Sequence, residues 1–151
     1  MITTLPTPCL CDSRHRNQKG TTHPFRVLVI DDVQDNADSM RMVLELYGFE
    51  VRVAYAGSMA IDVAREFCPD VVLCDIGMPI MCGYDVAQEL RADPRTARAR
   101  LVATTGFSSE TVELKCRTAG FERQMLKPID VDELRDLLAS WQGESVAESA
   151  A

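Results

Sequence analysis

The chain has 151 residues, of which 46% are hydrophobic and 26% are charged, and it carries a formal net charge of −7 with a pI near 4.8. This length predicts one domain that buries about two-thirds of its unfolded surface around a single core. The acidic balance argues against direct binding to nucleic acid, and no apolar run approaches the roughly 18 to 20 residues that span a membrane, so we expect a soluble, cytoplasmic protein with protein partners.

The two ends of the chain differ in composition from its middle. Residues 1–24 are polar, rich in Thr, Pro and basic groups, and lack periodicity, so we expect a flexible extension that cannot repay its ordering entropy by burial. For the same reason residues 143–151 are predicted to be a solvated, disordered tail. The folded domain is expected to cover residues 25–142.

Six cysteines are enough for disulfides or for a metal site. Cys9 and Cys11, with two histidines downstream, are metal-ligand residue types, but their one-residue spacing misses the pattern typical of structural zinc. Cys68 and Cys74 lie at or beside apolar segments, Cys82 lies in a predicted turn, and no secretory apolar stretch opens the chain. We interpret the cysteines as reduced thiols.

Between the ends, short apolar runs alternate with amphipathic segments five times, which is typical of βαβ units around a parallel sheet with helices on both faces. In chain order, the predicted strands and helices fall at 27–30, 35–47, 51–54, 57–67, 71–74, 83–92, 101–103, 108–118, 125–126 and 130–141. Gly48 and Gly120 are each followed by Phe, as expected of helices that end in a left-handed glycine. Asp130 is the predicted cap of the last helix.

Polar residues follow four of these strands at the first or second position. Asp31 and Asp32 follow the first strand, Asp75 the third, Thr105 the fourth and Lys127 the fifth. Because the carboxyl ends of parallel strands lie at one edge of an open sheet, where such folds bind ligands, we expect these side chains to meet in one pocket.

Gathered at that edge, the three carboxylates repel one another unless a cation binds them. Mg²⁺ prefers oxygen ligands in octahedral geometry and commonly uses one or two carboxylates, waters and a phosphate. We expect Asp32 and Asp75 to bind Mg²⁺ directly, Asp31 to act through a water, and the carbonyl of Gly77 to contribute from the next loop.

Phosphoryl transfer to a carboxylate requires that the negative charge of the incoming group be neutralised. Lys127 supplies a compact positive charge, and Thr105 supplies a hydroxyl that can donate to a phosphate oxygen. Asp75 is then the predicted nucleophile, which would form an aspartyl phosphate. Each residue taken alone also fits a structural role, such as a helix cap for Asp31 and Asp32. Their joint position at successive strand ends favours the functional interpretation.

These motifs resemble the receiver domain of two-component response regulators. The resemblance covers about 26–141 and rests on Val-Leu-Val-Ile-Asp31-Asp32, Leu-Cys-Asp75-Ile-Gly-Met-Pro, Ala-Thr-Thr105-Gly and Leu-Lys127-Pro128. It implies a flavodoxin-like, doubly wound five-stranded sheet in the order 2-1-3-4-5 and a cis bond before Pro128. It also implies Mg²⁺-dependent phosphorylation of Asp75 by a histidine kinase or histidine phosphotransfer protein, in a protein that catalyses only its own phosphotransfer and dephosphorylation.

In this interpretation the chain is a signalling switch. The new phosphoryl charge recruits Thr105 and Lys127, and the loop that bears Thr105 moves with the 108–118 helix, which creates a surface for a separate downstream partner. The family often has an aromatic residue three positions before the lysine, where this chain has Gln124. We therefore expect the chemistry to be retained while the output differs.

Three further expectations concern the surroundings of the pocket. Phe107 is predicted to shield the aspartyl phosphate from water and so to prolong its lifetime. The exposed side of the 35–47 helix, with Asp35, Asn36, Ser39 and Met42, is predicted to border the kinase docking surface. The 108–141 face is a candidate homodimer contact.

Two other classes of protein fit this sequence less well. An aspartate-nucleophile phosphohydrolase places a general acid two residues after the nucleophile, where this chain has Gly77. A flavin carrier needs phosphate-binding amides after the first strand, where Asp31 and Asp32 would repel a phosphate. A receiver-like scaffold that works without phosphorylation is the alternative that the sequence leaves open.

Overall fold

The computed structural model describes residues 24–149, in which five strands alternate with five helices. The strands are β1 (Arg26–Ile30), β2 (Glu50–Ala54), β3 (Val71–Asp75), β4 (Arg100–Thr105) and β5 (Arg123–Leu126). The helices are α2 (Gln34–Leu46), α3 (Gly57–Phe67), α4 (Gly83–Ala92), α5 (Glu110–Ala119) and α6 (Val131–Ser149). Cys9 and Cys11, and most of the predicted N-terminal extension, lie outside the described residues.

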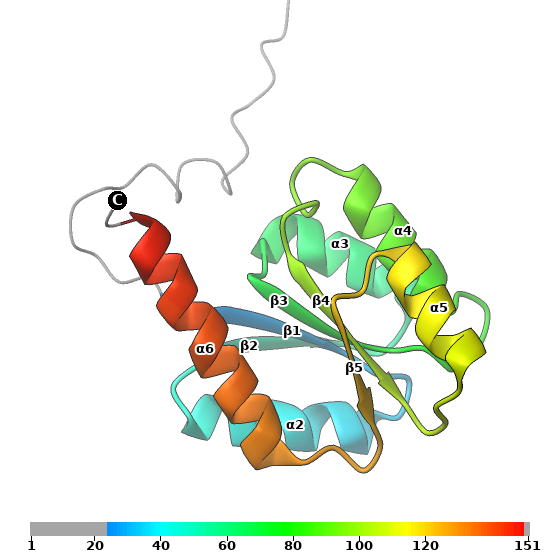
Figure 1. Cartoon of the computed structure of the whole chain (residues 1–151), viewed down its shortest axis with the longest axis horizontal. Helices are drawn as coiled ribbons and strands as arrows, with labels where there is room; N and C mark the ends of the chain where they lie inside the picture. The colour runs from blue at the N-terminus through cyan, green and yellow to red at the C-terminus, as the bar shows by residue number, and fades with distance from the viewer. Residues whose placement is uncertain (1–23, 150–151) are drawn as a thin grey trace, which may run out of the picture.

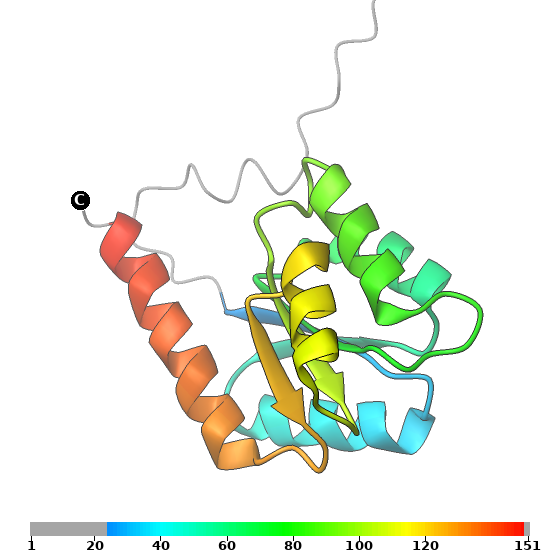
Figure 2. The ribbon, with the colours of Figure 1, turned by 45° about the vertical axis from the view of Figure 1, so that its right-hand side comes forward.

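The strands form one parallel sheet in the order β2-β1-β3-β4-β5, which confirms the predicted topology. Side chains alternate between its two faces because successive residues of a strand point in opposite directions. Val27 and Val29 of β1 pack under α2 and α6, whereas Leu28 and Ile30 pack under α3, α4 and α5. The helices therefore cover both faces, as Figure 1 and the turned view of Figure 2 show.

Several helix ends follow the expected chemistry. Gly48 and Gly120 have φ angles of 93° and 109°, the left-handed region in which a side chain is strained. Asp130 Oδ1 accepts hydrogen bonds from the backbone N–H groups of Asp132 and Glu133 at 3.0 and 3.2 Å, which caps α6. The Lys127–Pro128 bond is cis, as the resemblance implied.

Several element boundaries differ from the prediction, three of them for reasons that the structure shows. The helix α5 begins at Glu110 because the hydroxyl of Ser109 caps it, accepting from the N–H of Val112 at 3.2 Å. The strand β5 begins at Arg123, where backbone pairing with β4 starts although the side chains are polar. The helix α6 continues to Ser149 instead of ending near residue 141, since one Gly within a helix costs only about 1 kcal/mol.

A side chain of α4 fixes the far end of α5. Arg91 donates to the carbonyl oxygens of Ala97, Ala99 and Gly120 at 2.6, 2.7 and 2.7 Å. Gly120 ends α5, and a Cβ at this position would come within 2.9 Å of Arg91 Cγ. The carboxyl end of α5 is thus bonded to α4 and to the turn before β4.

The cysteines follow the prediction in part. Cys74, Cys82 and Cys116 are free thiols, but Cys68 is disulfide-bonded, so the expectation of reduced cysteines is wrong for that residue. Burial raises the pKa of the Cys74 thiol well above its ordinary value, which keeps it protonated. Among the described residues, no helix combines the length and apolar character needed to cross a membrane.

Candidate functional site

The carboxyl ends of β1, β3 and β5 bring four charged side chains together. Asp31, Asp32 and Asp75 each place one carboxylate oxygen within 4.8 Å of the others. Lys127 Nζ lies 3.1 Å from Asp31 Oδ2 and 3.2 Å from Asp75 Oδ2. The predicted convergence of acids and lysine from separate strands is therefore present in the fold.

The two inner acids, Asp31 and Asp75, are nearly closed off from solvent. Asp31 and Asp75 are 6% and 8% exposed, and their second oxygens accept from the N–H groups of Val33 at 2.9 Å and Gly77 at 3.1 Å. Partial burial lowers the pKa of Lys127, but its hydrogen bond to Asp31 and the charges of Asp75 and Asp31 outweigh this, so the net shift is upward. Lys127 is therefore a permanent positive charge in the pocket at neutral pH.

The charge balance of this pocket fits a divalent cation. Three carboxylates face one ammonium group, which leaves two negative charges uncompensated. Asp32, unlike the inner acids, is exposed, so an ion can approach from solvent on its side. Oxygen donors of this kind and number suit Mg²⁺ better than softer metals. The residues present therefore fit the metal that the resemblance implied.

Thr105 ends β4 next to this pocket, but its hydroxyl is engaged elsewhere. Thr105 Oγ1 donates to the carbonyl oxygen of Phe107 at 2.8 Å and lies 3.2 Å from the N–H of the same residue. Its backbone carbonyl accepts from the N–H of Lys127 at 2.7 Å, which ties β4 to the lysine. The fold places Thr105 where it was expected, with its hydroxyl turned into the following loop.

The loop from β3 to α4 is held against Asp75 by close backbone contact. Gly83 donates its N–H to the carbonyl of Ile76 at 3.1 Å, and a Cβ at Gly83 would lie only 2.6 Å from the carbonyl oxygen of Asp75. In the same loop Ile80 has a φ of 68° and is fully exposed. A β-branched residue is strained in this left-handed conformation. No sequence pattern predicted this strain.

A groove of about 520 Å³ leads from the pocket between α2 and the segment before α6. Its charged end contains Asp31 and Lys127, and its walls are mainly apolar, with Met40 and Val43 of α2 opposite Ile129. Asn36 and Ser39, both exposed, stand at its edge. The sequence predicted the outward face of this helix but not the hollow beside it, because its far wall follows Lys127 in the chain.

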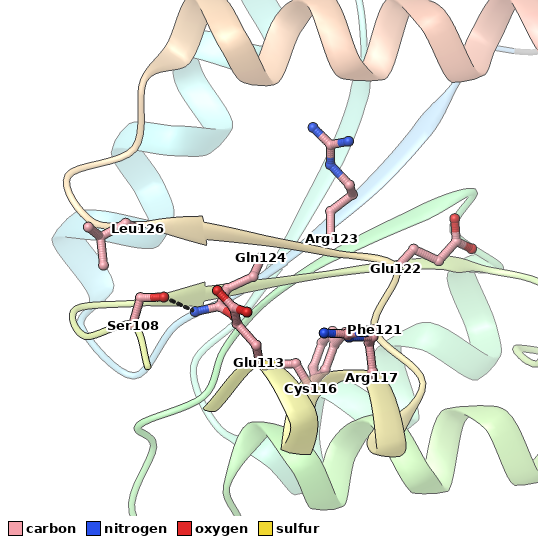
Figure 3. Close-up of a pocket in the computed structure, with 9 residues that line it drawn as sticks. All are labelled: Ser108, Glu113, Cys116, Arg117, Phe121, Glu122, Arg123, Gln124 and Leu126. Carbon is pink, nitrogen blue, oxygen red and sulfur yellow. Dashed lines mark hydrogen bonds between the residues drawn. The ribbon is translucent and has the colours of Figure 1, made fainter. Parts of the chain in front are cut away.

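A second hollow, of about 330 Å³, lies between α5 and β5 on another side of the molecule. Figure 3 shows Gln124 of β5 turned toward Ser108, with Glu113 on the facing helix and Arg123 directed away. Gln124 Nε2 donates to Ser108 Oγ at 3.4 Å. From the sequence, Gln124 differs only in standing where the family often has an aromatic residue; its bond to Ser108 could not be predicted because it depends on the path of the loop.

Comparison with known proteins agrees with this geometry. Residues 27–139 match the family model described as the response regulator receiver domain. The polar-differentiation response regulator DivK of Brucella anthropi is 30% identical over 122 residues, which cover 81% of this chain and 99% of the relative.

Solved structures of low sequence identity share the fold. The chemotaxis protein CheY4 of Vibrio cholerae superposes with a TM-score of 0.75 at 23% identity and covers 78% of this chain and 98% of its own. A CheY-like receiver domain protein from Methanospirillum hungatei gives a TM-score of 0.76 at 22% identity, with 83% and 99% covered.

Proposed function

This chain belongs to the response regulator receiver family, and from that premise we propose that it is a phosphorylation-dependent signalling switch whose acceptor is Asp75. The observation that carries the proposal is the position of the Asp75 carboxylate, nearly buried, beside two further acids and 3.2 Å from Lys127 Nζ. The proposed donor is a phosphohistidine of a histidine kinase or histidine phosphotransfer protein.

In the proposed reaction, a carboxylate oxygen of Asp75 attacks phosphorus. An O–P bond forms while the P–N bond to the donor histidine breaks, and the electron pair of that bond stays on the imidazole nitrogen. Lys127 already contacts Asp75 and is placed to balance the charge of the arriving phosphoryl group. The product is an aspartyl phosphate, which water later hydrolyses, so the chain acts on no substrate other than its own phosphoryl group.

We assign the divalent ion to Asp31, Asp32 and Asp75, with the carbonyl of Gly77 as the further ligand predicted from the sequence. Bound Mg²⁺ would supply positive charge to the phosphate oxygens. The residues of the chain have separate tasks: Asp31 holds Lys127, and the N–H of Gly77 orients one oxygen of Asp75.

The switch follows from a competition for the Thr105 hydroxyl. In the unphosphorylated chain this hydroxyl bonds to the backbone of Phe107. A phosphoryl group on Asp75 adds oxygens of higher negative charge, which are stronger acceptors than a carbonyl. If the hydroxyl turns to them, both bonds to Phe107 break and the loop before α5 is released toward a downstream protein.

The groove beside α2 is the proposed docking site of the phosphodonor. It opens at the charged pocket, its walls are apolar, and the exposed Met42 lies on the same helix. A donor helix seated there would bring its phosphohistidine to Asp75. Ser39→Glu is expected to slow transfer from the protein donor and to leave phosphorylation by acetyl phosphate unchanged. Loss of both reactions would contradict this assignment.

The decisive experiment is incubation with acetyl phosphate or phosphoramidate and Mg²⁺, followed by intact-mass measurement. The wild type is expected to gain one phosphoryl group, Asp75→Asn to gain none, and Asp62→Asn, which alters an exposed aspartate of α3, to match the wild type. Chelation of Mg²⁺ should abolish the gain. A wild type that is never modified would instead identify a scaffold that works without phosphorylation.

A further inference from the structure

The segment between β4 and α5, residues 106–109, is held by few side-chain hydrogen bonds. At its start, Phe107 is bound at its N–H and carbonyl groups to the Thr105 hydroxyl. At its end, Ser109 caps α5. Between these, Ser108 Oγ accepts from Gln124 Nε2 at 3.4 Å. This bond is the cross-link from the middle of the segment to the neighbouring strand.

Gln124 is placed for this contact by the sheet. It pairs with Ala103 on β4, so its side chain lies on the same face as that of Thr105, two residues further along β4. Its Nε2 reaches Ser108, whereas its Oε1 is buried without a hydrogen-bond partner among the residues that the structure describes. An amide with one buried, unsatisfied atom is held less firmly than a fully bonded one.

The hollow beside this contact leaves room for a rearrangement. Ser108 and Gln124 both line the 330 Å³ space between α5 and β5, and Leu126 at its edge is 54% exposed. Figure 3 shows the side chains of Ser108 and Gln124 directed toward each other among the residues that line this space. The segment can therefore move without displacing a packed core.

We propose that Gln124 is a positioning residue that, through Ser108, holds the segment 106–109 in the arrangement that occupies the Thr105 hydroxyl. The bond to Ser108 then stabilises the unphosphorylated conformation and is lost when Thr105 turns toward Asp75. This inference rests on the proposed function, because it describes what opposes phosphorylation of the same site.

The direction of the effect follows from linkage. A contact that is present only in the unphosphorylated conformation raises the free energy required to leave it. Removing the contact should favour the conformation that binds the phosphoryl group. Because a neutral hydrogen bond of this kind contributes modestly, the rate of phosphorylation is expected to rise roughly twofold to tenfold.

The test compares variants that remove either partner of the bond. Gln124→Met keeps the length of the side chain without the amide, Ser108→Ala removes the hydroxyl, and Ser108→Thr retains it. Arg123→Met is the matched control, since it replaces the adjacent residue of β5, whose side chain points away from Ser108 in Figure 3. The readout is the rate of mass gain with phosphoramidate and Mg²⁺.

Gln124→Met and Ser108→Ala should each accelerate the gain, and the double variant should be no faster than either single variant, because all three lack the same bond. Ser108→Thr and Arg123→Met should behave as the wild type. Unchanged rates in both single variants, or fully additive effects in the double variant, would overturn the inference.

A second readout does not depend on phosphorylation. In the unmodified protein, exchange of the Phe107 amide hydrogen, which the Thr105 hydroxyl protects, should be faster in Gln124→Met than in Arg123→Met. Faster exchange in a protein that never gains mass would uphold the role of Gln124 and reject the proposed function. Equal exchange together with normal mass gain would reject the role of Gln124 alone.

Discussion

The pocket at the strand ends and the surface between α5 and β5 lie on the same sheet but are held together differently. In the pocket, Asp31 and Asp75 are nearly buried and each of their carboxylates makes two polar contacts. Between α5 and β5, one 3.4 Å bond joins Ser108 to Gln124 beside an open space. The first region fixes charges in place, and the second is the region that we propose to rearrange on phosphorylation.

The largest effect is expected from removing the positive charge of the pocket. Lys127→Met leaves Asp31 and Asp75 facing each other without their shared cation, so an arriving phosphoryl group meets unbalanced negative charge. Phosphorylation by phosphoramidate should slow by about 100-fold or more. Lys115→Met, which alters an exposed lysine of α5, should leave the rate unchanged. Equal rates in the two variants would show that the pocket does not need its ammonium group.

The rigidity of the pocket can be tested at Gly83. A Cβ there would lie 2.6 Å from the carbonyl oxygen of Asp75 and 2.8 Å from Ile76 Cα, so the loop must shift. Gly83→Ala should lower the free energy of unfolding in urea by about 1 to 3 kcal/mol. Gly143→Ala is the control, because a Cβ at this exposed helical position meets no atom within 4 Å, and it should stabilise the chain by up to about 1 kcal/mol.

Ile80, in the loop between β3 and α4, has a strained backbone, unlike the well-bonded acids of the pocket. Its left-handed backbone is strained and its side chain is fully exposed, so nothing is gained by burial. Ile80→Asn should raise the free energy of unfolding by about 1 kcal/mol, because asparagine tolerates this conformation. A lower stability in this variant would mean that the isoleucine makes contacts that offset its strain.

The smallest effect is expected at Phe107, in the segment between β4 and α5. Its side chain is 68% exposed, so its shielding of an aspartyl phosphate against water is incomplete. Phe107→Ala should accelerate dephosphorylation by about twofold to threefold, which is less than 1 kcal/mol of barrier. The measurement is loss of the added mass after removal of the donor, and an unchanged or slower rate would reject the shielding role.

Residues at strand ends could be located from the sequence because topology alone decides where they lie. Apolar runs followed by Asp31, Asp75 and Lys127 are sufficient to predict that these side chains meet, once the sheet is parallel. The direction of the Thr105 hydroxyl was not predictable, because a hydroxyl rotates to the nearest acceptor and Phe107 provides one. The roles of these residues in catalysis stay predictions.

The remaining differences between the prediction and the structure arise from interactions between segments that are far apart in the sequence. The bond from Gln124 to Ser108 joins residues that are separated by 16 positions, and no local pattern encodes it. The beginning of β5 at Arg123 is set by pairing with Val102, since its own side chains are polar. The disulfide of Cys68 likewise has no signature in the apolar segment beside it.

The contact of Arg91 with Gly120 has a consequence for how a signal leaves the molecule. It fixes the carboxyl end of α5 to α4, while the amino end of α5 continues into the segment that carries Ser108. If α5 rotates about this fixed carboxyl end, the displacement of its residues increases toward its amino end. A partner that binds the phosphorylated and unphosphorylated chains with different affinity would therefore show the largest difference if it contacts the first turn of α5, from Glu110 to Glu113. It would show the smallest difference if it contacts the last turn.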